Sequence, residues 1–371
     1  MPALRPLLRR LDPRRTRSNA QEVADLREQV ARLRARSTRL QARVDKLAGR
    51  RRELQAQLRT ASGAARTTAV GEVPGVSRLE LRRRCALEGV PADPLILEIG
   101  PAHNAVFPKR EGFRTRTVDY LDRAGLIKRY EDFPHYSPDD IEEVDYVLAP
   151  GSAMADVIDE RFDVVMASHV LEHTTSMIDF LDECAKLLAP GGTLALVVPD
   201  HRYCFDRFRE RSSIARVIDA SLAPPPVHTV GTVIEERLNA SRHRGSTAWL
   251  PGHRGDYELI HDTASVLATG EQARVADRYI DTHNWVCTPN HLRLLLQDLH
   301  ELGFVSLRES FFHDTVRHEF FLNLRLDAPG SGLTREELLV LSENERRSLD
   351  EPTFAAPEAG AEPGPEPDPA S

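Results

Sequence analysis

The feature that most constrains the fold is an alternation of short apolar runs with amphipathic helical patterns between Pro91 and Leu326. The apolar runs have the length of buried strands. Strands that alternate with helices form a mainly parallel sheet with helices on both faces, and such a sheet binds ligands beyond the carboxyl ends of its strands. We therefore predict an α/β fold with seven strands, over residues 95–99, 115–118, 144–148, 162–167, 193–198, 304–307 and 319–326.

Two helices between these strands carry clear end signals. One begins after Ser176, has an apolar stripe along one face, and stops at the Pro-Gly-Gly of residues 190–192. The other begins at Pro289 and ends before Gly303. A shorter helix is predicted over residues 76–88. A polar insertion at about residues 200–288 separates the fifth strand from the later helix, and we expect it to form a lid over the carboxyl edge of the sheet.

Polar residues follow the first two predicted strands at this edge. Glu98 and Gly100 end the first strand, and Asp119 ends the second about 20 residues later. A carboxylate in that place can accept hydrogen bonds from both hydroxyls of a ribose, and a glycine lets the backbone approach a ligand. Ordinary turn residues would give the same pattern, so these residues alone are weak evidence.

The segment around the fourth strand carries the stronger signal. It reads Phe-Asp-Val-Val-Met-Ala-Ser-His-Val-Leu-Glu-His over residues 162–173, and Leu-Ala-Pro-Gly-Gly-Thr-Leu follows over residues 188–194. With Glu98, Gly100 and Asp119, this segment resembles the class I S-adenosylmethionine-dependent methyltransferases over about residues 93–205. The resemblance implies a Rossmann-like sheet with an antiparallel last strand, and S-adenosyl-L-methionine as the cofactor.

The resemblance also implies a set of cofactor-binding residues. Gly100 would line the methionine part together with Glu98, Asp119 would hold the ribose, and Ser168 and His169 would flank the sulfonium. The set that this implies is Glu98, Gly100, Ala102, Asn104, Asp119, Ser168 and His169.

Two positions depart from the pattern of this family. Its Gly-x-Gly-x-Gly becomes Gly100-x-Ala102-x-Asn104, in which asparagine is among the residues best able to adopt a left-handed conformation. The acidic residue that contacts adenine in many members falls here on Gly151-Ser152, where a backbone or hydroxyl contact would have to replace it.

A longer resemblance, over strings such as LEIGPAHNAVFPKREGF and DTHNWVCTPNHLRLLLQDL, is to bacterial members associated with cell-surface polysaccharide biosynthesis. It implies O-methylation of a sugar in a glycan or glycolipid. A sugar hydroxyl needs a base, and we predict His173 and His201, which adjoin the carboxyl ends of strands. Asp281, His283 and Trp285 are predicted to bind the sugar, with Trp285 stacking on its ring.

Other functions remain open. Residues 169–173 read His-Val-Leu-Glu-His, an inverted zinc-protease signature, but a strand precedes it and no metal is expected. A non-catalytic methyltransferase-like scaffold, recruited to a glycan-assembly complex, would suit the altered glycine loop. Nucleic acid is not an expected partner, because the body of the chain is acidic.

The N-terminal segment has the period of a coiled coil. Nine of its eleven a and d positions between Val23 and Leu58 are apolar. This predicts a homodimer through residues 23–58, with a single helix packed on its own body as the alternative. Residues 1–60 hold 17 basic and 6 acidic residues, a net charge of +11, so the rest carries −19 of the total of −8. The positive charge of residues 1–60 predicts that this segment binds an anionic membrane surface or an acidic partner. The alternative is a solvated helix with basic outer positions.

These observations divide the chain into four parts. They are a basic coiled coil at 1–62, a linker and short helix at 63–90, the methyltransferase domain at 91–328, and a helical fragment with an acidic Pro-rich tail at 329–371, where the tail is predicted to be disordered. Four widely spaced cysteines and the lack of a long apolar run predict a cytoplasmic protein, with peripheral attachment to the inner face of the membrane as a further possibility.

Overall fold

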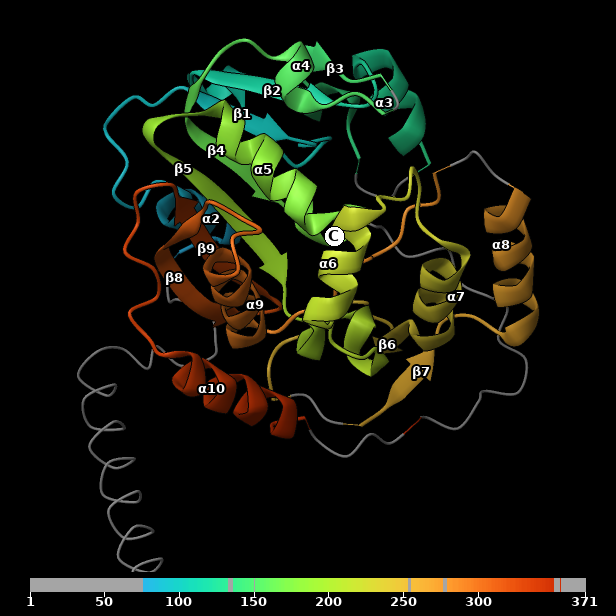
Figure 1. Ribbon diagram of the computed structural model, residues 1–371. Coiled ribbons are helices and arrows are strands. Elements are labelled where there is room, and N and C mark those ends of the chain that lie inside the picture. The colour runs from blue at the N-terminus through green and yellow to red at the C-terminus, as the bar shows by residue number, and fades with distance from the viewer. Residues whose placement is uncertain are drawn as a thin grey trace, which may run out of the picture. The chain divides into compact units, whose positions relative to one another are not determined.

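The computed structural model describes residues 76–132, 136–149, 151–252, 255–275, 279–349 and 354 (Figure 1). All of these belong to one compact unit, Val70–Ser371. The predicted coiled coil, with its dimer contact at residues 23–58, lies outside the described residues, as does most of the C-terminal tail.

The centre of this unit is a seven-stranded sheet in the order β3-β2-β1-β4-β5-β9-β8. Strands β1 to β5 run parallel, whereas β9 is antiparallel to both β5 and β8. This confirms the predicted mainly parallel sheet with an antiparallel last strand. The strands are β1 (Ile96–Ile99), β2 (Thr115–Asp119), β3 (Tyr146–Val147), β4 (Phe162–Ser168), β5 (Leu188–Pro199), β8 (Arg308–Val316) and β9 (Glu319–Arg325).

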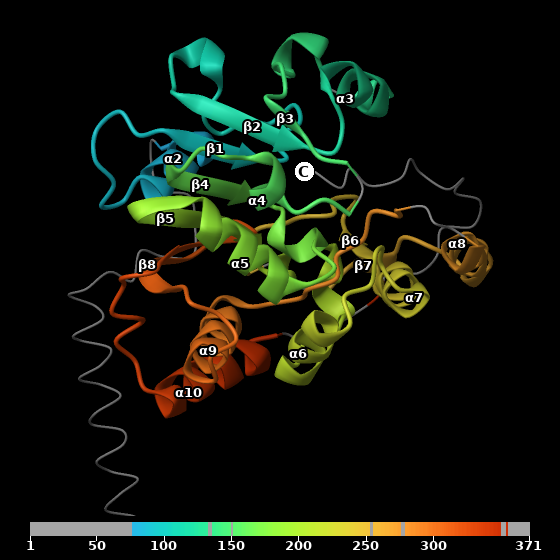
Figure 2. The ribbon, with the colours of Figure 1, turned by 45° about the horizontal axis from the view of Figure 1, so that its top comes forward.

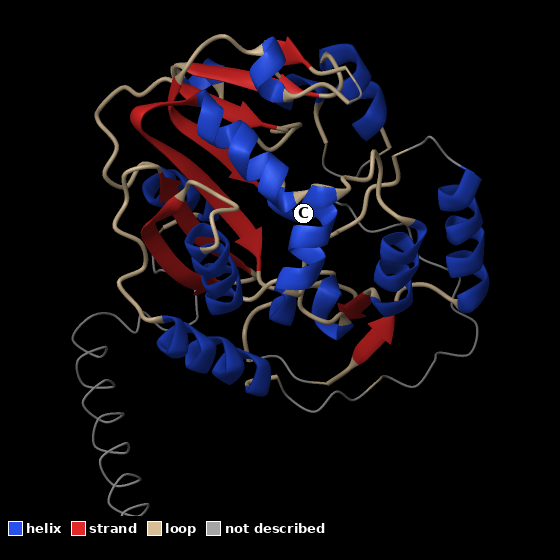
Figure 3. Cartoon of the chain, viewed as in Figure 1, coloured by secondary structure: helices blue, strands red, loops and turns tan. Residues whose placement is uncertain are grey.

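Both faces of the sheet are covered by helices. Successive side chains of a strand point to opposite faces, so neighbouring residues of β1 belong to different apolar clusters. Leu97 of β1 joins one buried apolar cluster, to which α5 (Met177–Leu187) and α9 (Pro289–Glu301) contribute. Its neighbour Ile96 joins a second cluster, to which α2 (Arg78–Ala86) contributes. Figure 3 shows α5 and α9, both located by their labels in Figure 1, in front of the strands.

Helices α5 and α9 lie where the sequence predicts them. The hydroxyl of Ser176 accepts a hydrogen bond from the Asp179 N–H and caps α5. Gly303, with φ +79°, ends α9, and the N–H of Phe304 donates to the Leu299 carbonyl. The strand predicted over residues 304–307 is wrong: Phe304 still closes the helix, residues 305–307 are irregular, and β8 starts at Arg308.

The insertion after β5 folds into helices and a small hairpin. Figures 1 and 2 both show these elements on the side toward which β1 and β4 point, which is where a lid was predicted. They are α6 (Ile214–Leu222), α7 (Val230–Asn239), β6 (Ser241–His243), β7 (Tyr257–Leu259) and α8 (Thr263–Val275), with β6 and β7 paired antiparallel.

Helices outside the predicted 91–328 boundaries also pack on this body. The Arg82 side chain of α2 reaches Glu319 of β9, and Glu345 of α10 (Arg335–Arg347) accepts hydrogen bonds from Asn290 of α9. The remaining helical elements are α3 (Arg123–Tyr130), α4 (Met154–Val157), and the 3-10 turns η1 (Lys109–Glu111), η2 (Pro138–Asp140), η3 (Leu171–His173), η4 (His201–Tyr203) and η5 (Phe205–Phe208).

All four cysteines are free and buried. Among the helices that the structure describes, none combines the length and the apolar character that crossing a bilayer requires.

Candidate functional site

Three predicted cofactor residues stand side by side at the carboxyl edge of the sheet. Ile99 of β1 is level with Val118 of β2 on one side and with Ala167 of β4 on the other. The residues that come next are Gly100, Asp119 and Ser168, so they are level with one another on three adjacent strands. Neighbouring strands lie about 4.8 Å apart, which places these residues within the length of one nucleoside.

The loop after β1 turns sharply away from the sheet. Gly100 has φ +59°, and a Cβ there would meet only Val170 Cγ2, at 3.8 Å, so the backbone conformation rather than space calls for glycine. Ala102 also has a positive φ, of +44°. Asn104 is not among the described residues with positive φ, so the left-handed residue of the altered loop is Ala102 and not, as predicted, Asn104.

The side chain of Glu98 stabilises this loop through hydrogen bonds to its backbone. Its carboxylate accepts the N–H of Val106 at 2.6 Å and the N–H of Phe107 at 3.0 Å, and its side chain is 1% exposed. Burial raises the pKa of Glu98 to about 7, although both hydrogen bonds oppose this change. The carboxylate of Glu98 therefore fixes the shape of the loop, and its place beside the cofactor stays a prediction.

Asp119 presents a carboxylate at the end of β2. Its Oδ1 accepts the N–H groups of Tyr120 at 2.7 Å and Leu121 at 3.3 Å, which orients the group. No described residue donates a hydrogen bond to the other oxygen, Oδ2. Burial raises the pKa of Asp119. One fixed oxygen and one available oxygen suit a carboxylate that binds sugar hydroxyls.

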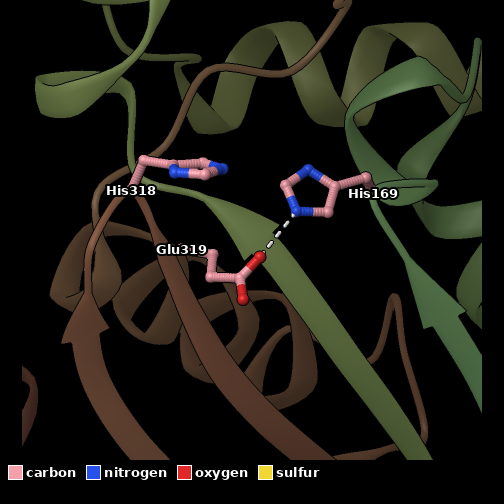
Figure 4. Close-up of side chains that lie close together, drawn as sticks. All are labelled: His169, His318 and Glu319. Carbon is pink, nitrogen blue, oxygen red and sulfur yellow. Dashed lines mark hydrogen bonds and ion pairs between the residues drawn. The ribbon is translucent and has the colours of Figure 1, made fainter. Parts of the chain in front are cut away.

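His169 follows β4 in a left-handed conformation, with φ +54°. Figure 4 shows its ring pointing at Glu319, where Nε2 lies 3.0 Å from Oε2, and shows His318 beside the pair. Glu319 also accepts two hydrogen bonds from Arg82, at 3.2 and 2.6 Å. Burial would lower the pKa of His169, but its contacts with Glu172 and Glu319 raise it. His169 thus lies within a buried network of charged side chains that favours its protonated form.

The inverted zinc-protease signature lies on the 3-10 turn η3 and not within an α-helix. Its two histidines diverge: His169 faces Glu319, whereas His173 Nδ1 lies 2.9 Å from Asp281 Oδ1. Burial would lower the pKa of His173, but Asp281 raises it to about 9. A zinc-protease site needs both histidines of the signature on one metal ion. In this segment, which the structure describes, the two rings face different carboxylates instead.

Two of the predicted sugar-binding residues adjoin His173. Asp281 pairs with it, and the ring of His283 makes an edge contact with it at 4.6 Å between centroids. Trp285 does not fit its predicted role. It is 3% exposed, belongs to the main apolar cluster, and donates its Nε1–H to Thr174 at 3.0 Å. No face of its ring is left for a sugar, because the insertion uses it as core.

His201 lies just beyond β5 and is 4% exposed. Neither ring nitrogen has a hydrogen-bond partner among the described residues. Burial lowers its pKa to about 4, so the ring is neutral at pH 7. The two histidines predicted as bases therefore differ in charge state, since His173 is protonated at that pH.

The ionic partners that complete this region carry no signature in the sequence that predicts their contacts. Glu319 and Arg82 belong to no sequence motif. Glu319 reaches His169 because β9 pairs with β5 beside β4, and Arg82 of α2 bonds Glu319. Asp206 and Arg209 form a second buried pair, with 2.9 Å between Oδ1 and the guanidinium nitrogen. Asp206 also bonds His283 Nδ1. For the Asp206–Arg209 ion pair, the sequence offers one indication: a carboxylate followed three residues later by an arginine, inside a polar insertion.

Comparison with known proteins places the chain in a family. A family model described as a methyltransferase domain matches residues 34–299, well over half of the chain. The chain therefore belongs to this family of methyltransferase domains.

Individual relatives are more distant. A ubiquinone biosynthesis O-methyltransferase of Nitrobacter winogradskyi is 50% identical over 36 residues, which span 10% of this chain and 14% of that protein. The CcbJ methyltransferase from Streptomyces caelestis is 14% identical over 68% of this chain and 90% of its own, with a TM-score of 0.36. The glycopeptide N-methyltransferase MtfA, solved with (S)-adenosyl-L-methionine, is 15% identical over 70% of this chain and 99% of its own, with a TM-score of 0.33.

Proposed function

We propose that this chain is a methyltransferase that uses S-adenosyl-L-methionine. The observation that carries the proposal is the alignment of Gly100, Asp119 and Ser168 at the carboxyl edge of β1, β2 and β4. Membership of the methyltransferase-domain family supports the reaction class.

The residues at this edge fit such a cofactor. Asp119 Oδ2 is available to accept a hydrogen bond from the ribose. The backbone at Gly100 turns with positive φ, so that it can pass close to the methionine part. Ser168 and His169 border the same edge from β4. When bound, the cofactor supplies the methyl group that an acceptor nucleophile displaces in line.

We propose a sugar hydroxyl, in a cell-surface glycan or glycolipid, as the acceptor. The sequence resemblance to polysaccharide-associated members supports this choice, and so does the position of the polar insertion over the carboxyl edge (Figure 2). Asp281 and His283 remain candidates for contacts with the acceptor, whereas the buried Trp285 does not.

His201 is the better of the two candidate bases. It is neutral at pH 7 and has no hydrogen-bond partner among the described residues, whereas His173 is protonated and paired with Asp281. We expect His201→Ala to lower the methylation rate at least tenfold, within the range of general-base effects, and to leave cofactor affinity unchanged. Single-turnover rates measured beside cofactor titrations check this; equal rates in the variant and the wild type would reject His201 as the base.

The experiment for the function itself is a calorimetric titration of the full chain with S-adenosyl-L-methionine. We expect one site per chain and a dissociation constant in the micromolar range, about −8 kcal/mol. An absence of binding at millimolar cofactor would favour the alternative, a methyltransferase-like scaffold without catalysis.

A further inference from the structure

A second group of side chains near the carboxyl edge has the composition of a metal site. Glu172, His173 and His283 each offer one ligand atom, and these atoms all lie within 4.8 Å of one another. Glu172 and His173 come from the turn after β4, whereas His283 comes from the end of the insertion. Two imidazoles and one carboxylate form the ligand set of many catalytic zinc sites and of non-haem iron sites.

Each of these histidines is oriented by a carboxylate of its own. Asp281 lies 2.9 Å from His173 Nδ1, and Asp206 bonds His283 Nδ1. Both contacts use Nδ1, which leaves Nε2 of each ring for a ligand; at His173 a metal ion would have to displace the proton that the ring carries at pH 7. Metal-binding histidines almost always donate their other ring nitrogen to a carboxylate or carbonyl; His283 bonds Asp206 in this way, whereas His173 and Asp281 form a close ion pair without the geometry of a hydrogen bond. Arg209 in turn fixes Asp206 at 2.9 Å.

Glu172 is a buried carboxylate without a hydrogen bond from the described residues; burial would raise its pKa, but the neighbouring His169 and His173 lower it. It is 1% exposed, and neither carboxylate oxygen has a hydrogen-bond partner among the described residues. His169 Nδ1 approaches one oxygen at 3.3 Å, without the geometry of a hydrogen bond. A buried carboxylate without hydrogen bonds costs several kcal/mol. A metal ion bound to it would remove that cost directly.

The neighbouring group of His169, His318 and Glu319 (Figure 4) also has metal-ligating atoms close together, but its charges are already matched. Both oxygens of Glu319 accept hydrogen bonds from Arg82, and one of them also contacts His169. A dication there would have to displace a guanidinium that cannot lose its charge. The two groups therefore differ in their carboxylates. Both oxygens of Glu319 accept hydrogen bonds, whereas neither oxygen of Glu172 accepts one from a described residue, so only Glu172 has oxygens available to a metal ion.

We propose that Glu172, His173 and His283 bind a divalent transition-metal ion of the zinc type. Ligands around zinc lie about 2.0–2.2 Å from the ion, so the three side chains need to close on it by no more than about 1.5 Å. No metal is expected from the sequence, because residues 169–173 directly follow a strand; the third side chain of this group, His283, lies 110 residues after His173. If the proposed function holds, the ion would bind the acceptor oxygen and lower its pKa; binding of the ion itself does not depend on that function.

The test measures zinc binding to the full chain after removal of metal with a chelator. Calorimetry and elemental analysis of the desalted protein should give one zinc ion per chain, and Co²⁺ should give the visible absorption of a low-coordinate site. We expect His283→Ala and Glu172→Ala to weaken zinc binding at least 100-fold, and Asp281→Asn to weaken it about 10- to 100-fold through the orientation of His173.

His318→Ala and His313→Ala are the controls, the first in the neighbouring group and the second in β8, and both should bind zinc like the wild type. If His283→Ala does not fold, His283→Gln replaces it, and circular dichroism verifies each variant. The proposal is overturned if the wild type binds no zinc at tens of micromolar, if His283→Ala and its replacement bind it normally, or if His318→Ala alone abolishes binding. Cofactor titration of the metal-free protein tests the proposed function separately.

Discussion

Replacing Glu319 with glutamine should lower the free energy of unfolding by about 3–5 kcal/mol. The carboxylate of Glu319 is 1% exposed; it is the counter-ion of Arg82, which is 7% exposed, and it also contacts His169. Arg82 and His169 hold the pKa of Glu319 well below its usual range, although burial opposes this. Glutamine keeps the volume and removes the charge, so the guanidinium would remain buried without a counter-ion.

Denaturant unfolding of the wild type and Glu319→Gln measures this difference. Glu258→Gln is the matched control, because Glu258 pairs with Arg242 across β6 and β7 at 3.3 Å but is 45% exposed. Exposed pairs contribute about 1 kcal/mol or less. If Glu319→Gln costs no more than Glu258→Gln, the buried network does not stabilise the fold as described.

Asp119→Ala should weaken the binding of S-adenosyl-L-methionine at least 100-fold. A hydrogen bond to a charged group contributes about 1.5–3 kcal/mol, and the proposed carboxylate would accept two from the ribose. A loss of about 3 kcal/mol corresponds to about 100-fold in affinity. Titration calorimetry measures the change, with unfolding curves to verify that the variant is folded.

Asp122→Ala is the control for this experiment. Asp122 is a nearby carboxylate that caps α3 by accepting the Gly125 N–H at 2.8 Å, so its loss should reduce stability by about 1 kcal/mol and leave cofactor affinity within about threefold. An unchanged affinity in Asp119→Ala would remove this carboxylate from the cofactor site.

Local sequence patterns predicted the sheet and the positions of Gly100, Asp119 and Ser168. Buried runs such as Ile96–Ile99 and Phe162–Ser168 are apolar in nearly every position, so their strand character follows from composition. In a parallel sheet, the residues after such strands necessarily meet at one edge. The candidate cofactor site could therefore be predicted from the sequence.

Side-chain partners could not be inferred in the same way. Glu319 lies 237 residues from Arg82 and 150 from His169, and no periodicity connects them. Trp285 has the residue type that stacks on sugar rings, but its burial depends on how the insertion, through α6, packs on α5. Asn104 tolerates positive φ, yet the turn requires that conformation at Ala102, and only the backbone path decides between them.

The most direct test of the central claim is a structure of the full chain bound to S-adenosylhomocysteine. We expect the ribose hydroxyls within hydrogen-bonding distance of Asp119, the amino-acid part over the turn at Gly100, and the sulfur beside Ser168 and His169. A nucleoside bound away from the carboxyl ends of β1, β2 and β4 would contradict the account.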